Sequence, residues 1–286
     1  MKILEIGKVD LASLCYLNKE RYPFLLESVN HNDKNRYSIL FAFPGKSIVL
    51  NNFSDFNFLS ELEKQFKLNN LKTNLPFSGG WFVYLSYELI GQIEPILSRE
   101  LHTSELPIAY AVKIPSAIII DYQLNTTYLI DQDSDQSRID TILTDIELIK
   151  PIPEENILGE LSQENEDKFI SGVNACLDYI VAGDVFQVNL SRQWQYKLTK
   201  EIDSAVIYQA LKNANPAPFS ALIQYENFSI VSSSPERLFH VQDGILQTRP
   251  IAGTHPRGQG SEDEAQKEGL ISHPKEIAEH VMLLDL

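Results

Sequence analysis

Long apolar runs, cysteines and positive charge are scarce in this sequence, and each shortage excludes a class of protein. The apolar run AIIIDYQL at 117–124 has the length of a strand, whereas a membrane-spanning helix needs roughly 20 apolar residues. The N-terminal MKILEIGKVDL lacks the apolar core of a signal peptide, so we expect a cytoplasmic protein with no membrane association. The 39 acidic and 24 basic residues give a net charge of −15, which argues against nucleic acid as a partner.

The two cysteines, Cys15 and Cys176, lie far apart in the sequence and fit no metal-binding spacing. We therefore expect both to be buried free thiols. The 286 residues, 43% of them apolar, are enough for one large or two ordinary domains with a sizeable core. In so acidic a chain, an anionic substrate would need a local positive element such as a metal ion or a helix N-terminus.

Hydrophobic periodicity predicts a mixed α+β protein. The first half is rich in strand-like segments, and Pro44-Gly45 suggests a hairpin between strands at 37–43 and 46–51. Further strands are expected over 79–89 and 109–122, and helices over 54–68, capped by Ser54, and over 135–150.

Residues 151–168 are acidic and punctuated by prolines, so we interpret them as a linker between an N-terminal region, 1–150, and a second region, 169–286. An amphipathic helix is predicted over 164–184, ending at Gly183 as its C′ residue. Turn residues then predict hairpins at 224–228 and 241–246, the second of them around an Asp-Gly pair.

Alternation of side chains along VFQVNLSRQWQY predicts a strand over 185–196. One face would be apolar, interrupted by Arg192, and would carry Phe186, Val188, Leu190, Trp194 and Tyr196. The other face would carry uncharged polar residues, namely Gln187, Asn189, Ser191, Gln193 and Gln195. Such a polar face can line a cavity for a ligand, or it can simply face solvent.

Two segments carry carboxylates that could act as a general acid or bind a cation. In SSSPERL (232–238), Glu236 would act as a general acid if it enters a desolvated pocket; otherwise it is an exposed loop residue. SHPKEIAEHVMLLDL (272–286) is predicted to be helical from Pro274, with an apolar stripe of Ile277, Val281 and Leu284. Glu276 and Glu279 share one face of this helix, where they can hold a hard cation or merely favour the helix N-terminus.

The segment TRPIAGTHPRG (248–258) can form neither a helix nor a regular strand because of its two prolines and two glycines. Its centre is small, with Ala252 and Gly253 side by side. Small residues at a turn are typical of a site where a ligand or another part of the chain approaches the backbone closely. We therefore expect something to pack against this turn.

The order and spacing of these motifs resemble the chorismate-binding enzyme family. The matching segments are GDVFQVNLSR, SSSPERL, QTRPIAGTHPRG and HPKEIAEHVMLLDL. The family includes anthranilate synthase component I, aminodeoxychorismate synthase component I, and the isochorismate and salicylate synthases. YPFLLESVNHNDKNRYSIL (22–40) and PFSGGWFVYLSYEL (76–89) are similar to the component I branch.

The resemblance covers nearly the whole chain and implies a two-sheet sandwich with flanking helices, an α+β fold. Family members continue well past HVMLLDL, so the fold is expected to be incomplete at its C-terminus. On this basis the chain, which stops at Leu286, is expected to have little or no activity by itself.

The resemblance also implies roles for single residues. Glu276 and Glu279 match acidic residues of the Mg²⁺ site on which the dianion chorismate is held, and Glu236 matches an acid that protonates the departing C4 hydroxyl. Gly253 and Thr254 match a turn that lies against the substrate ring. Where water-using relatives carry a lysine that activates water, this chain has Gln187, which cannot be that base. Ammonia is therefore the expected nucleophile.

The residue type at the position of Ala252 differs between the two kinds of component I enzyme. Many aminodeoxychorismate synthases carry a lysine here that attacks C2 of chorismate, whereas anthranilate synthases carry alanine. The motifs QVNLSR, APFSAL, SSSPERL and QTRPI nevertheless resemble aminodeoxychorismate synthase, so we expect that activity, in folate biosynthesis, with ammonia from a glutamine amidotransferase subunit. Anthranilate synthase is the alternative, and a non-catalytic fragment that binds tryptophan or docks the glutaminase is a third.

LLES (25–28) and NRYS (35–38) are similar to a tryptophan pocket of the family. In anthranilate synthases that pocket gives feedback inhibition, and in aminodeoxychorismate synthases it can hold tryptophan structurally. Ser28, Tyr37 and Pro218 are the candidates here. The alternative for these three residues is ordinary core and turn packing.

Overall fold

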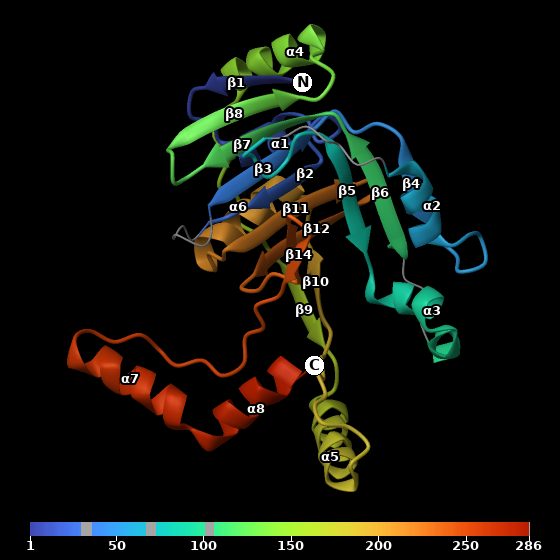
Figure 1. The fold of residues 1–286 in the computed structure, drawn as a ribbon, viewed down its shortest axis with the longest axis vertical. Coiled ribbons are helices and arrows are strands. Elements are labelled where there is room, and N and C mark those ends of the chain that lie inside the picture. Colours follow the sequence, from blue (N-terminus) through green and yellow to red (C-terminus); the bar gives the residue numbers. More distant parts are fainter. Residues whose placement is uncertain (30–35, 67–72, 101–105, 286) are drawn as a thin grey trace.

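The computed structural model of the chain describes residues 1–29, 36–66, 73–100 and 106–285. Its main feature is a seven-stranded antiparallel sheet of strands that are far apart in the sequence. The strand order is β1 (Lys2–Ile6), β8 (Thr126–Asp131), β7 (Ser116–Asp121), β3 (Tyr37–Ala42), β2 (Phe24–Glu27), β11 (Phe219–Tyr225) and β12 (Phe228–Ser234). Strands from both sides of the predicted 151–168 linker thus share one sheet (Figure 1).

A second sheet and three helices cover the two faces of this first sheet (Figure 1). The second sheet has the order β4 (Ser47–Leu50), β6 (Ala109–Ile114) and β5 (Gly80–Leu85). The helices against the other face are α1 (Leu11–Leu17), α4 (Gln136–Leu148) and α6 (Ser204–Ala214). Because both faces are covered, β7 can be apolar on each side: Ile118 faces the helices, and Ile119 lies in a cluster on the opposite side.

Aromatic side chains join the two sheets. Phe24 of the large sheet stacks on Phe82 of the small one, with ring centroids 4.1 Å apart and planes 2° apart. Phe41 and Tyr110 complete this inter-sheet core together with Val112 and Ile114. Burial of these large side chains is the main force that holds the sandwich together.

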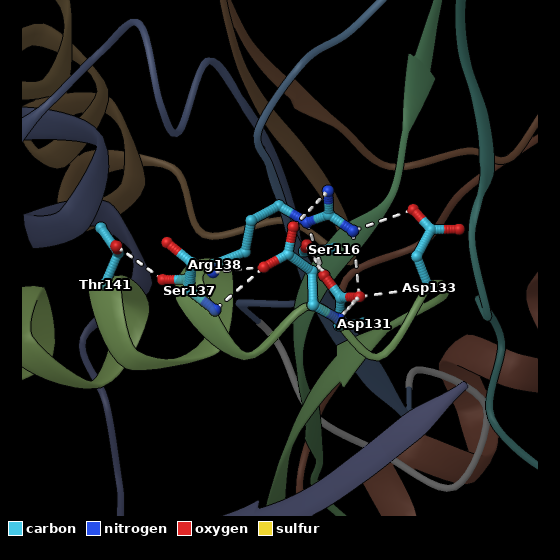
Figure 2. A network of polar contacts seen from close by, with 7 residues as sticks. Ser116, Asp131, Asp133, Ser137, Arg138 and Thr141 are labelled. Carbon is cyan, nitrogen blue, oxygen red and sulfur yellow. Dashed lines mark hydrogen bonds and ion pairs between the residues drawn. The ribbon is translucent and has the colours of Figure 1, made fainter.

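The turn from β8 into α4 is fixed by a polar network around Asp131, which is fully buried (Figure 2). Its carboxylate accepts hydrogen bonds from Ser116 Oγ at 2.6 Å, from the backbone N–H of Asp135 at 2.8 Å and from Arg138 Nε at 2.7 Å. Burial alone would raise the pKa of Asp131, but these hydrogen bonds hold the pKa at about 2. Asp135 then caps α4 by accepting from the N–H groups of Ser137 and Arg138.

The remaining elements are smaller or lie outside the two sheets. The strand pairs are β9 (Gly159–Gln163) with β10 (Trp194–Leu198) and β13 (His240–Gln242) with β14 (Ile245–Gln247). The other helices are α2 (Phe58–Gln65), α3 (Ile90–Ile93), α5 (Glu166–Ala182), α7 (Ser261–Ser272) and α8 (Pro274–Asp285), with 3₁₀ turns η1 (Tyr87–Leu89) and η2 (Pro95–Glu100). Figure 1 shows α5, α7 and α8 extending away from the two sheets, and no residue of these helices is buried.

Several sequence predictions are confirmed. The mixed α+β class holds, α4 and α5 lie within the expected helical segments, and Gly183 ends α5 in the left-handed region with φ of 81°. The hairpin at 241–246 turns through Asp243 and Gly244, both with positive φ. No helix in the described ranges is long and apolar enough to cross a membrane.

Other predictions need correction. Strands β3 and β4 do not form a hairpin with each other: β3 pairs with β2 and β7, and β4 pairs with β6 in the other sheet. Helix α2 begins at Phe58 with Asn57 as its cap, instead of after Ser54. Part of the predicted linker forms β9. Cys15 is a buried free thiol as expected, but Cys176 is only half-buried.

The strand predicted over 185–196 is shorter than expected. Only Trp194–Leu198 is a strand, because only this part finds a partner in β9, and residues 185–193 have no regular structure. The apolar face is therefore not formed: Phe186 is 87% exposed. Gln187 lies in the irregular segment that connects α5 to β10.

Candidate active site

Three contacts link the segments in which the sequence places its candidate residues. Glu236 Oε1 accepts a hydrogen bond from the backbone N–H of Ile251 at 3.3 Å. Gly253, two residues further on, lies against Glu276 of α8. Gln187 Nε2 donates to Glu279 Oε1 at 3.3 Å. The chain thereby connects four segments that are separated by up to 92 positions in the sequence.

Glu236 lies directly after β12, in an exposed turn. Ser234 shapes this turn because its hydroxyl donates to the Glu236 carbonyl at 2.9 Å and accepts from the Glu236 N–H at 3.3 Å. Pro235, which has no N–H to donate, keeps the backbone out of a longer strand. Of the two interpretations of Glu236, the described residues show the exposed loop position and no desolvated pocket, since the side chain is exposed and its contact is with the Ile251 backbone.

The small residues of TRPIAGTHPRG are explained by the close approach of α8. A Cβ atom at Gly253 would overlap the Glu276 carboxylate, with Oε2, Cδ and Cγ as its nearest atoms. Ala252 is half-buried beside it, whereas Thr254 is exposed. The end of the segment is anchored on α7, where Asp263 accepts from Arg257 Nε and Nη2, both at 2.6 Å, and from the N–H of Gly258 at 3.0 Å.

Helix α8 begins at Pro274, as predicted, and presents Glu276 and Glu279 on one half-buried face. The predicted apolar stripe is not packed: Ile277, Val281 and Leu284 are 45%, 49% and 66% exposed. Ser272 is the last residue of α7, where its hydroxyl donates back to the Glu268 carbonyl. The acidic face of α8, rather than its apolar one, is thus the face turned toward Gly253 and Gln187.

The oxygen atoms of Glu276 and Glu279 are of the type that Mg²⁺ prefers. They are one helical turn apart, and Gln187 holds the second carboxylate through its amide nitrogen. Within the described ranges, no group of three or more His, Cys, Asp or Glu side chains could hold a metal ion. The two carboxylates alone therefore do not make up a metal site, and a cation held there would need further ligands from water or substrate.

The three candidates for a tryptophan pocket lie together at one end of β2, β3 and β11. The Val29 N–H donates to the Ala217 carbonyl at 3.1 Å, so Ser28, directly after β2, lies near Pro218, directly before β11. Continuing the β2–β3 register beyond Leu26 and Ile39 places Ser28 opposite Tyr37. Ser28 is buried, while Tyr37 and Pro218 are half-buried.

Sequence reasoning missed the polar residues that surround Ser28. Ser38 Oγ accepts from the Ser28 N–H at 3.0 Å and lies 2.9 Å from the Tyr122 hydroxyl. Nearby, Glu27 accepts from the Tyr208 hydroxyl at 2.7 Å and from Lys212 Nζ at 2.8 Å. Ser38 and Glu27 belong to the NRYS and LLES motifs. Tyr208 and Lys212 come from α6, and no sequence motif linked them to this pocket.

Comparison with known proteins identifies the family. A family model described as chorismate binding enzyme matches residues 22–286, so the chain belongs to the chorismate-binding enzymes. It is 33% identical to an anthranilate synthase component I-like protein of Synechocystis over 91% of this chain and 55% of that protein. It is 34% identical to aminodeoxychorismate synthase component 1 of Bacillus subtilis over 82% of this chain and 53% of that protein.

Solved structures agree with the fold. The crystal structure of anthranilate synthase component I from Streptococcus pneumoniae superposes with a TM-score of 0.71 at 25% identity, covering 91% of this chain and 62% of that one. The α+β class and the recognition of the family are therefore confirmed. The chain spans about half the length of the two relatives above. Because both component I names occur among the relatives, the comparisons leave the particular reaction open.

Proposed function

We propose that this chain carries the chorismate site of an enzyme that aminates chorismate with ammonia to give 4-amino-4-deoxychorismate. The observation that carries the proposal is the position of Gln187, whose amide donates to Glu279 beside the acidic face of α8. A carboxamide is neither a base nor a nucleophile at neutral pH, so this side chain cannot activate water. It can orient a carboxylate, and ammonia is then the proposed nucleophile.

The proposed reaction exchanges the C4 hydroxyl of chorismate for an amino group and releases water. Hydroxide is a poor leaving group, so a proton must reach the C4 oxygen as the bond breaks, and Glu236 is the proposed donor. Gly253 and Thr254 would let the substrate ring lie close to the backbone. Glu276 and Glu279 would hold Mg²⁺, which supplies the positive charge that a dianionic substrate needs in an acidic protein.

Ala252 has no nucleophilic group, so we propose that ammonia attacks the substrate directly instead of displacing an enzyme amine. Free ammonia is scarce at neutral pH, and a glutamine amidotransferase subunit in the cytoplasm is the proposed source. The product would then enter p-aminobenzoate and folate biosynthesis.

Anthranilate synthase is the second candidate, and Ala252 is the observation that favours it. That reaction adds ammonia at C2 as the C4 hydroxyl leaves as water, and it then eliminates the enolpyruvyl group as pyruvate to leave anthranilate. The Synechocystis relative, which carries the anthranilate synthase name, supports it as well. We prefer amination at C4 because QVNLSR, APFSAL, SSSPERL and QTRPI all resemble the aminodeoxychorismate enzymes. Feedback inhibition by free tryptophan would favour the second candidate. The third candidate, a non-catalytic chain that only binds tryptophan or the glutaminase, would catalyse neither reaction.

The test is the dependence of chorismate consumption on ammonium. The natural protein that contains this sequence is given chorismate and Mg²⁺, with or without ammonium chloride, and chorismate loss is followed by liquid chromatography. We expect loss only when both Mg²⁺ and ammonium are present. Consumption at the same rate without ammonium, with isochorismate as the product, would show that water is the nucleophile and would overturn the proposal.

A further inference from the structure

Strand β5 leaves one edge of the small sheet open. The sheet has the order β4-β6-β5, so β6 lies on one side of β5 and no strand in the described ranges pairs with its other side (Figure 1). Ser86, directly after β5, donates its N–H to the carbonyl of Ile108, directly before β6, at 3.0 Å. Because successive residues of a strand point their N–H and C=O groups in opposite directions, Gly80, Phe82 and Tyr84 face β6 as Ser86 does.

The N–H and C=O groups of Trp81, Val83 and Leu85 therefore point to the open edge. None of these backbone groups has a hydrogen-bond partner in the parts of the chain that the structure describes. The side chains of Val83 and Leu85 are 39% and 47% exposed, so solvent reaches this strand. An open edge of this kind is a template to which another strand can add.

The open edge lacks the charges with which proteins usually protect such a strand. Residues 73–87 are the longest stretch of the sequence without Asp, Glu, Lys or Arg. By contrast, β1, an edge strand of the large sheet, carries Lys2 and Glu5. The net charge of −15 makes two copies of the chain repel each other, and the uncharged edge is a surface at which they can meet without opposing like charges.

The open edge is also complementary to itself. In an antiparallel pair of two copies with Val83 on the two-fold axis, Val83 lies opposite its own counterpart and Trp81 lies opposite Leu85. All three residues point their backbone groups outward, so each of these pairs can exchange two hydrogen bonds. Their side chains form apolar cross-strand pairs on one face, and Phe82 lies opposite Tyr84 on the other. The pattern thus fits a second copy both in register and in chemistry.

Exposed apolar side chains continue beyond the strand. Tyr87 in η1, Ile93 in α3 and Ile96 in η2 are 79%, 57% and 84% exposed. In the two-fold pair the end of one β5 lies beside the start of the other, so these side chains are close to the partner copy. Because the paired region is short, the expected dissociation constant is on the order of 10 µM, weaker than that of an obligate dimer.

We propose that two copies of this chain associate through β5 and join their three-stranded sheets into one continuous sheet across a two-fold axis. The interface uses neither the irregular segment of Gln187 nor the acidic face of α8. It is therefore independent of the proposed reaction, and its test needs no chorismate.

Sedimentation equilibrium of the 286-residue chain between about 1 and 100 µM tests the association. We expect the mass to rise with concentration from the 32.5 kDa of one chain toward twice that value. Hydrogen exchange at the backbone amides of Trp81, Val83 and Leu85 should slow as the dimer forms. A mass of 32.5 kDa over the whole range would overturn the proposal and would leave the edge to a strand of another protein.

A charge at the centre of the interface locates it. Val83→Lys should raise the dissociation constant by at least about tenfold, because two lysines then face each other across the axis. Ile3→Lys is the matched control, since Ile3 is also 39% exposed and lies on β1, an edge strand of the large sheet. Both variants change the net charge equally, and Ile3→Lys should stay within about twofold of the unmodified chain. Equal effects of the two variants would overturn the assignment.

Val83→Pro tests the backbone pairing itself. The Val83 N–H points away from β6, so proline removes only the donor at the open edge, where an edge strand tolerates it. This variant should also raise the dissociation constant by at least about tenfold, and Val83→Ala, which keeps the N–H, should weaken the dimer less. If circular dichroism shows that Val83→Pro does not fold, Val83→Lys still decides. A folded Val83→Pro chain that dimerises as before would contradict strand pairing.

Discussion

At the scale of single residues, Asp131 shows how a buried charge can stabilise the fold. Its pKa of about 2 lies below the ordinary value of roughly 3.9, so the folded state favours the ionised form. A carboxyl group with a lowered pKa contributes stability that is fully present above its unfolded pKa and is lost as the pH falls through its folded pKa. The contribution of Asp131 is therefore complete above about pH 4 and disappears toward pH 2.

Asp131→Asn should lower the free energy of unfolding by about 2–3 kcal/mol at pH 7, because the ionised acceptor of Arg138 and Ser116 is lost. Urea titrations of both proteins between pH 7 and pH 2.5 measure this difference, which should shrink below pH 4. The control is Asp133→Asn, an exposed partner of Arg138, which should cost less than about 0.5 kcal/mol. A difference that does not change with pH would contradict the account.

Glu236 is the residue on which the proposed chemistry depends most. Glu236→Gln in the natural protein should lower the turnover of chorismate by roughly 100-fold or more, because the amide cannot protonate the leaving hydroxyl. Steady-state kinetics at saturating chorismate measure the effect, and Glu160→Gln on β9, also exposed, is the control. A loss of less than a few-fold would return Glu236 to the role of an ordinary surface residue.

At the scale of elements, the contact between α8 and residues 251–253 sets the geometry of the candidate site. Gly253 has an ordinary φ, so alanine is acceptable to the backbone there and only the Glu276 side chain opposes it. Gly253→Ala should displace α8 and lower turnover by about tenfold or more. Gly7→Ala, where nothing lies within 4 Å of the new Cβ, should stay within about twofold. Equal effects of the two variants would show that the close approach has no role in the reaction.

The acidic face of α8 predicts a specific dependence on Mg²⁺. Glu279→Ala should shift the Mg²⁺ concentration needed for half-maximal turnover upward by about tenfold or more, since one of the two proposed carboxylate ligands is lost. Glu268→Ala, an exposed acid on α7, is the matched control and should leave the titration in place. An unchanged Mg²⁺ titration in Glu279→Ala would remove this residue from the metal site.

Elements with local signals were predictable from the sequence, and elements that need a distant partner were not. Gly183 and the Asp243-Gly244 turn act through the conformation of their own backbone, so α5 and the β13–β14 hairpin were found. The alternation over 185–196 is as regular as that of a true strand. It fails as a prediction because a strand needs a partner for its hydrogen bonds, and β9 reaches only Trp194–Leu198.

At the scale of the whole molecule, the strand order could not be read from local patterns. Pro44-Gly45 suggested a hairpin, yet β3 lies in the large sheet and β4 in the small one. The choice follows from burial of Phe24, Phe41 and Phe82 between the two sheets, a property of residues that are distant in sequence. The candidate site residues were proposed from motif resemblance, whereas the contact that explains Gly253 became visible only when α8 was placed.

The central claim is that ammonia, rather than water, attacks chorismate at this site and replaces the C4 hydroxyl. The most direct measurement is the mass of the product formed by the natural protein from chorismate, Mg²⁺ and ¹⁵N-ammonium. We predict a product that keeps the enolpyruvyl group, contains one labelled nitrogen and yields labelled p-aminobenzoate with the downstream lyase. Labelled anthranilate together with pyruvate would contradict the account and would show that Ala252 is the better guide to this enzyme than its four framework motifs.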